Sequence, residues 1–155
     1  MSHWLYNGEP FTEVPEKAFG FVYKITNTET GKKYLGRKQF NSTRRKPLTK
    51  KQKDAGRVKR TVLRSESNWR EYTSSSTTLN EDIEKNGKDI FIFEILVVCY
   101  TKGQCNYIEE NLQHKFNVVW DDSWYNDSVG SGKWMSVKLT DDIKKQIKNI
   151  DKNLG

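Results

Sequence analysis

Apolar and more polar residues alternate with a period of two near the start of the chain. The apolar set occupies every second position of one segment: Phe19, Phe21, Tyr23 and Ile25. This period is typical of a half-buried strand. The turn-forming sequence of residues 27–31 follows, and a shorter strand resumes at 33–36. We therefore expect a β-hairpin over residues 18–36.

The register of this hairpin follows from the length of its turn. If the loop is Thr28–Gly31, Ile25 lies opposite Tyr34. Tyr23 lies two positions from Ile25, so it projects on the same face as Tyr34. The pattern thus predicts two phenol side chains on one side of the hairpin.

Three further segments have clear periodicity. Residues 91–98 are apolar on both faces, which favours a central strand. A capping box at 78–81 predicts a helix that ends at Gly87, and a second helix begins near Gly103 and extends to Phe116. An amphipathic helix is expected over 138–155. These elements predict an α+β fold with a small, three-stranded antiparallel sheet, formed by the hairpin and the central strand and flanked by helices.

The length of 155 residues fits a single domain over 1–155. We expect an irregular lead-in over 1–17, a basic insertion over 37–72 and the C-terminal helix over 138–155. No run of the sequence is long and apolar enough for a membrane span, and the first residues do not resemble a secretory signal. With only two cysteines, Cys99 and Cys105, we expect a reducing cytoplasm.

Positive charge is concentrated in one part of the chain. The net charge is +7, yet residues 37–64 hold twelve basic residues and one acidic residue, a local charge of +11. Such a segment repels itself unless a polyanion neutralises it. It forms either a helix from about Thr49 to Arg64 or a flexible arm that orders on binding. It has no apolar stripe that would anchor it to a membrane.

Common catalytic and metal-binding patterns are missing from the sequence. Neither serine nor cysteine has a convincing histidine and acid partner, and His3 and His114 are the only histidines. The two cysteines lack the second pair that a zinc site needs. The Gly-Ser-Gly-Lys segment at 130–133 lacks the preceding strand of a phosphate-binding loop. The hairpin tyrosines and the neighbouring basic residues remain the strongest candidates.

The hairpin resembles the paired motif of the GIY-YIG nuclease family. Phe21-Val22-Tyr23 is followed, after ten residues, by Tyr34-Leu35-Gly36. Four further pieces of the family pattern occur in the same order over residues 18–128: Arg44, Asn86-Gly87 before the strand at 91–96, Glu109 with Leu112, and Tyr125-Asn126. The sequence departs from the family at Phe21, which replaces the usual glycine, and at Leu48, where a histidine or tyrosine is frequent. Tyr72 is a candidate for that second role, and Glu110 is an alternative to Glu109.

The resemblance implies hydrolysis of DNA phosphodiesters with one divalent cation, Mg²⁺ or Mn²⁺. Glu109 is then the metal ligand, since a carboxylate suits Mg²⁺, and Arg44 contacts the phosphate. Tyr23 activates or positions the water, and Tyr34 and Tyr72 orient it or the phosphate. We expect nearby cations, including Arg37 and Lys38, to lower the pKa of Tyr23. Asn126 is expected to support the site by hydrogen bonding.

The implied partner is DNA, most simply double-stranded, bound by a monomer or a homodimer. Small nucleases of this kind occur in phages, which would place the protein in the host cytoplasm. The expected nucleic-acid contacts come from basic side chains: Arg37, Lys38, Arg45, Lys46, Lys50, Lys51, Lys53, Arg57, Lys59, Arg60 and Arg64. Two alternatives stay open at this point: a non-catalytic DNA-binding protein that reuses the fold, and an RNA-binding module.

Overall fold

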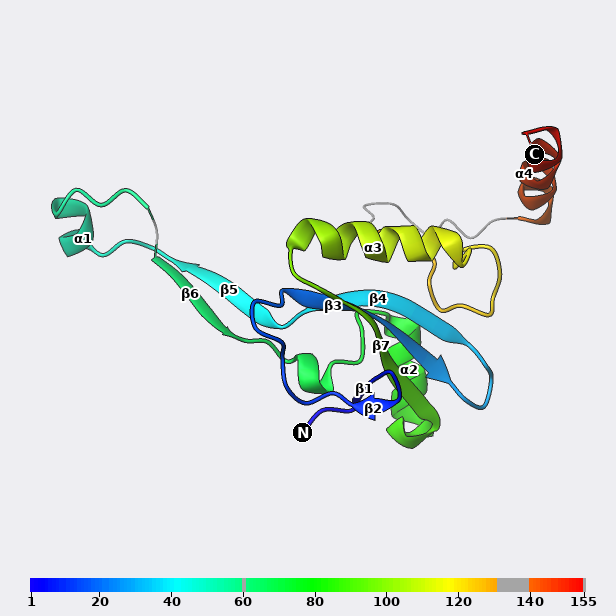
Figure 1. Ribbon diagram of the computed structural model, residues 1–155, viewed down its shortest axis with the longest axis horizontal. Coiled ribbons are helices and arrows are strands. Elements are labelled where there is room, and N and C mark those ends of the chain that lie inside the picture. The colour runs from blue at the N-terminus through cyan, green and yellow to red at the C-terminus, as the bar shows by residue number, and fades with distance from the viewer. Residues whose placement is uncertain (60, 131–139, 155) are drawn as a thin grey trace.

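The computed structural model describes residues 1–59, 61–130 and 140–154. Its main sheet has five strands in the order β2-β1-β7-β3-β4, and strands β5 and β6 form a separate two-stranded ribbon. Figure 1 shows α3 along one side of the main sheet and the ribbon extending away from it. The predicted α+β class is confirmed, with a mostly antiparallel sheet.

The predicted hairpin is formed by β3 (Gly20–Asn27) and β4 (Lys33–Gln39). Its register is the expected one, because Ile25 pairs with Tyr34. Asn27 stabilises the turn, since its Oδ1 accepts hydrogen bonds from the backbone amides of Glu29 and Thr30. Local pattern and turn chemistry were therefore sufficient to predict this part of the fold.

Strand β7 (Phe91–Cys99) lies in the middle of the sheet, as its apolar pattern indicated. The prediction of an irregular lead-in over 1–17 was wrong. That segment contains β1 (Trp4–Tyr6), which pairs in parallel with β7, and β2 (Glu9–Pro10), which pairs with β1. These strands are too short for a periodic signal, and the burial of Trp4 in the core stabilises them.

The helices lie close to their predicted positions. α2 spans Thr77–Asn86 and ends at Gly87 as expected, but Ser76 rather than Thr78 caps its N-terminus. α3 spans Lys102–Lys115 and α4 spans Asp141–Leu154. Short 3₁₀ helices occur at Trp69–Glu71 and Lys88–Ile90. Within the described part of the chain, no helix is long and apolar enough to cross a membrane.

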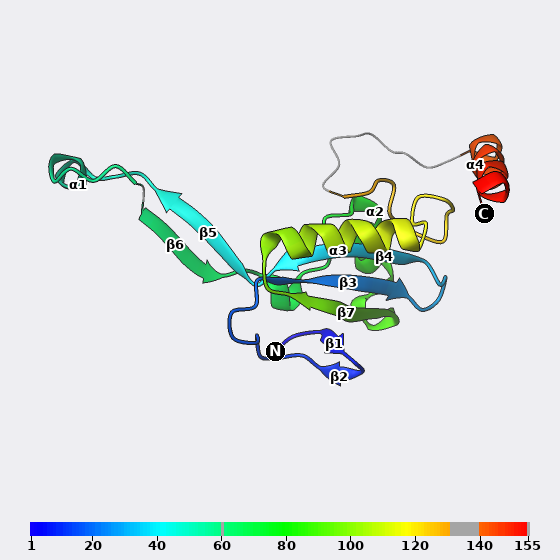
Figure 2. The same ribbon diagram turned by 45° about the horizontal axis from the view of Figure 1, so that its top comes forward.

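The helix over 49–64, one of the two forms expected for the basic insertion, does not occur. The insertion contains β5 (Asn41–Lys46), the five-residue α1 (Lys50–Asp54) and β6 (Thr61–Glu66). Figure 2 shows α1 at the far tip of the ribbon. Thr49 and Gln52 form a capping box at the start of α1, and the positive φ of Gly56 stops its continuation. Arg37 and Lys38, placed at the start of the insertion from the sequence, belong to β4 instead.

Two apolar clusters lie on opposite sides of the main sheet. The first contains many aromatic rings, and Phe21 is at its centre, with ring centroids 5.0 Å from Trp4 and 5.1 Å from Phe40. The second lies beneath α3 and includes Val22, Leu35 and Cys105. Phe21 and Val22 are adjacent strand residues, so they point to opposite faces and each contributes to a different cluster.

Candidate active site

A cleft of about 630 Å³ runs along the free edge of β4. Residues from β3, β4, β5, α2, α3 and the connecting loops line it, among them Tyr23, Tyr34, Arg37, Tyr72, Glu109 and Asn126. Five of the six predicted catalytic residues therefore line one cavity. Arg44 is the exception, because it lies on the exposed ribbon strand β5.

The two hairpin tyrosines lie close together over Gly36. The ring centroids of Tyr23 and Tyr34 are 6.1 Å apart, and Tyr23 pairs across the sheet with Gly36. A Cβ atom at position 36 would lie 2.6 Å from the Tyr23 hydroxyl oxygen and 2.9 Å from the Tyr34 ring. The glycine of the second motif is thus needed for space: any side chain there would displace both phenols.

Burial controls the ionisation of these tyrosines. Tyr23 is 1% exposed, and this burial raises its pKa well above 10, with smaller contributions from Tyr34 and Tyr72. Arg37 lowers the pKa, but its effect is outweighed. Burial also raises the pKa of Tyr34. Arg37 thus acts in the expected direction, but the net shift of the Tyr23 pKa is upward, because desolvation of the phenolate is the larger effect.

Glu109 is a buried carboxylate on α3. It is 7% exposed, and its Oε1 lies 3.4 Å from Nε of Arg37. Burial raises the pKa of Glu109 to about 6 even though Arg37 opposes the shift. Glu110, the alternative from the sequence, is exposed and does not line the cleft. The orientation of α3 therefore brings Glu109, and not its neighbour, to the tyrosines.

Two buried amide side chains secure the open edge of β4 beside the cleft. Asn126 accepts a hydrogen bond from the Leu35 amide at 3.0 Å and donates one to the Leu35 carbonyl at 2.8 Å. Gln113 donates to the same carbonyl at 3.1 Å and accepts from the Gly130 amide at 2.7 Å. They replace the missing neighbouring strand, so the backbone that carries Tyr34 and Gly36 is held in place.

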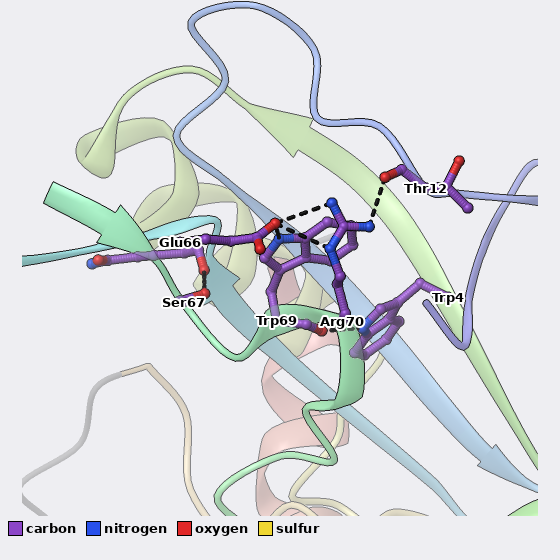
Figure 3. A network of polar contacts seen from close by, with 7 residues as sticks. Trp4, Thr12, Glu66, Ser67, Trp69 and Arg70 are labelled. Atoms are coloured by element: carbon purple, nitrogen blue, oxygen red, sulfur yellow. Dashed lines mark hydrogen bonds and ion pairs between the residues drawn. The ribbon is translucent and has the colours of Figure 1, made fainter. Parts of the chain in front are cut away.

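Tyr72 enters the cleft from the segment after β6. Its ring meets Tyr23 edge to face with centroids 6.2 Å apart, and Nζ of Lys38 lies 4.1 Å from its ring centroid. The N-terminal segment holds this region in place: His3 Nε2 is 3.0 Å from the Tyr72 carbonyl oxygen, and Trp4 donates to the Trp69 carbonyl at 2.6 Å. The Trp4 contact is visible in Figure 3. Leu48, which occupies the family position for this role, lies beside α1 on the ribbon.

The basic residues predicted to bind nucleic acid fall into two groups. Arg37 and Lys38 line the cleft. The second group is exposed on the ribbon and its tip: Arg45, Lys46, Lys50, Lys51, Lys53, Arg57, Lys59 and Arg64. Arg60 lies outside the described residues. The sequence indicated Arg37 only as a nucleic-acid contact and a cation near Tyr23. It did not indicate Gln113, although Gln113 follows Glu109 by four positions and so shares its helix face.

The side chains of the cleft are suited to one hard divalent cation that has few protein ligands, and not to a metal ion enclosed entirely by protein side chains. No cluster of three or more histidine, cysteine or acidic side chains occurs within the described ranges. Glu109 offers a buried carboxylate, and Asp127 adds a second carboxylate to a cleft that is otherwise lined mainly by hydroxyl, amide and basic side chains. Mg²⁺ commonly uses one or two carboxylates and completes its shell with water and phosphate oxygens. The residues present therefore fit a single Mg²⁺ or Mn²⁺ ion whose remaining ligands are not protein side chains.

Comparison with protein families gives one match. The family model described as "Putative endonuclease segE, GIY-YIG domain" matches residues 4–129. This range contains the whole main sheet, the ribbon, α2, α3 and the cleft residues named above. Comparisons with curated proteins and with solved structures give no match.

Proposed function

Because this chain belongs to the GIY-YIG endonuclease domain family, we propose that it is a metal-dependent DNA endonuclease that hydrolyses phosphodiester bonds. The family supports nuclease activity in general. The choice of DNA, the metal and the residue roles are our proposal. The observation that supports them best is the convergence of Tyr23, Tyr34 and Glu109 on one polar cleft beside Arg37.

Glu109 would hold the cation. A bound Mg²⁺ or Mn²⁺ supplies positive charge that stabilises the leaving oxygen of a phosphodiester. Arg37 is the cleft arginine and would donate from its guanidinium to the non-bridging phosphate oxygens, the role that the family pattern suggested for Arg44. This geometry supports Arg37 because its Nε already faces the carboxylate of Glu109.

The tyrosines would orient the attacking water. Tyr23 is a protonated phenol at neutral pH because its pKa is well above 10, so its hydroxyl donates and accepts hydrogen bonds. Loss of that proton requires additional positive charge close to Oη, which the cation site beside Tyr23 would provide. Tyr34 and Tyr72 flank Tyr23 and would restrict where the water lies. Asn126 keeps the β4 edge in position.

The test is cleavage of supercoiled plasmid DNA with Mg²⁺, with Mn²⁺ and with EDTA. Wild type is expected to relax or linearise the plasmid only when the metal is present. Glu109→Gln and Tyr23→Phe should each lower the rate by at least about 10²-fold, the range for loss of an acid–base or charge-stabilising group. Glu110→Gln is the matched control, since it removes the adjacent carboxylate outside the cleft, and its rate should equal that of wild type.

Three results would contradict the proposal or part of it. Intact plasmid in every lane, together with demonstrated DNA binding, would favour a non-catalytic binding protein. Equal activity in Glu109→Gln and wild type would remove Glu109 as the metal ligand. A preference for cleaving RNA over DNA in the same assay would reassign the substrate.

A further inference from the structure

The ribbon formed by β5, α1 and β6 is not packed against the rest of the protein. Its two strands form a sheet of their own, and every described side chain of both strands is exposed. Figures 1 and 2 both show it extending away from the main sheet. A two-stranded ribbon that buries neither face is only marginally stable in water. The ribbon is also strongly basic, so a polyanionic partner would both neutralise and stabilise it.

The base of the ribbon is firmly attached to the main body. Phe40, immediately before β5, is 1% exposed, and its carbonyl accepts a hydrogen bond from the Ser67 amide at 2.9 Å. At the end of β6, Glu66 pairs with Arg70 at 3.0 Å. Figure 3 shows this contact and the Arg70 hydrogen bond to the Thr12 carbonyl. The direction in which the ribbon leaves the cleft is therefore defined.

The strand register divides the basic residues between two faces. Ser42, Arg44 and Lys46 share one face of β5, because side chains alternate along a strand. Ser42 and its neighbour Asn41 both line the active-site cleft, so the base of the ribbon continues the wall of the cleft. Arg45 lies on the other face, as does Thr43, which pairs with Arg64. Thr43 and Arg64 line a second cleft of about 450 Å³ at the ribbon base, together with Lys17 and Lys102.

We propose that the ribbon inserts into the major groove of duplex DNA and that Arg44 reads a base there, next to the bond held in the cleft. The major groove is about 12 Å wide and admits a two-stranded ribbon, and its most frequent specific contact is an arginine that donates two hydrogen bonds to guanine. The opposite face, with Arg45, Arg64 and the second cleft, contacts backbone phosphates. This inference rests on the proposed function for the position of the cut, and it makes Arg44 a specificity residue rather than a catalytic one.

The experiment uses a library of duplexes with random sequence and the full-length protein. Bound duplexes are selected in EDTA, and cleaved ends are sequenced separately in Mg²⁺. Wild type should prefer guanine at one fixed distance from the cut. Arg44→Gln should lose that preference, reducing discrimination by about 5- to 150-fold. Arg44→Lys should also lose the guanine preference, although it keeps the charge, because an ammonium group cannot form the paired hydrogen bonds.

Variants of matched charge separate base reading from phosphate contact. Arg45→Gln removes the same charge from the neighbouring position on the opposite face. It should weaken binding equally for all sequences and lower the slope of log K against log salt by about 0.9 per lost phosphate contact. Lys85→Gln, at the end of α2, should change neither property. Replacing guanine by 7-deazaguanine should mimic Arg44→Gln, whereas a minor-groove ligand such as netropsin should not displace the protein.

Several outcomes would overturn the proposal. They are a flat sequence profile for wild type, an unchanged profile in Arg44→Gln, or displacement by netropsin with no effect of 7-deazaguanine. A large loss of turnover in Arg44→Gln on every sequence, with the profile intact, would make Arg44 catalytic. If the EDTA selection shows the preference but no metal-dependent cleavage occurs, the groove proposal stands and the nuclease proposal fails.

Discussion

Burial of the Glu109 carboxylate destabilises the folded protein by an amount that can be measured. Its pKa in the folded protein is about 6, against an ordinary value of 4.5. Between these values the folded chain binds more protons at Glu109 than the unfolded chain does, so stability from this group falls as the pH rises from 4.5 to 6 and is constant above. A difference of 1.5 pKa units corresponds to about 2 kcal/mol.

The perturbation is Glu109→Gln, which keeps the shape of the side chain and an acceptor for Arg37. In EDTA at pH 8, the free energy of unfolding of the variant should exceed that of wild type by about 2 kcal/mol. This difference corresponds to a Tm that is about 4–8 °C higher. At pH 4 the two proteins should have equal stability, because wild-type Glu109 is then protonated in both states. Urea titration at both pH values, with thermal melts in parallel, measures the difference.

Metal binding should stabilise wild type relative to Glu109→Gln and so reverse the difference in stability seen in EDTA. Mg²⁺ should raise the Tm of wild type in proportion to the logarithm of its concentration above Kd and leave Glu109→Gln unchanged. Glu110→Gln is the control and should stay close to wild type, with a small downward shift of the Glu109 pKa because the Glu110 carboxylate contributes to raising it. If Glu109→Gln is less stable than wild type at pH 8 in EDTA, the attraction of Arg37 exceeds the desolvation of the carboxylate, and the reasoning is refuted.

Three further substitutions test the architecture around the cleft. Gly36→Ala should cost about 1–3 kcal/mol in urea unfolding and abolish plasmid cleavage, because the new Cβ overlaps the Tyr23 hydroxyl; a fully active variant would contradict this. Asn126→Ala leaves the Leu35 amide without its partner, so stability should fall by about 1–3 kcal/mol and hydrogen exchange at that amide should accelerate; unchanged exchange would show that water satisfies this edge. Phe21→Gly restores the glycine usual in the family and should cost at least about 3–5 kcal/mol, because it empties the aromatic cluster; a stable variant would mean that neighbouring rings collapse into the space.

The sequence by itself determined the hairpin and the central strand. Periods of two and the turn residues act over short range, so the Ile25–Tyr34 register could be derived without the fold. The same holds for helices α3 and α4, whose apolar spacing is local. The order of the motif pieces was also sufficient to indicate the family, which the family match over residues 4–129 supports.

Tertiary structure alone decided which residues share the cleft. The sequence favoured Glu109 over Glu110 only through its spacing to Leu112, and it is the packing of α3 against the sheet that turns Glu109 inward. Spacing along the chain suggested Arg44 as the site arginine, but the chain leaves the sheet at Phe40, so Arg44 lies on the ribbon and Arg37 faces Glu109. The ribbon has no buried face and hence no hydrophobic period to predict it. The shift of the Tyr23 pKa is likewise a property of complete burial, which depends on contacts from β1, β4 and the segment around Tyr72.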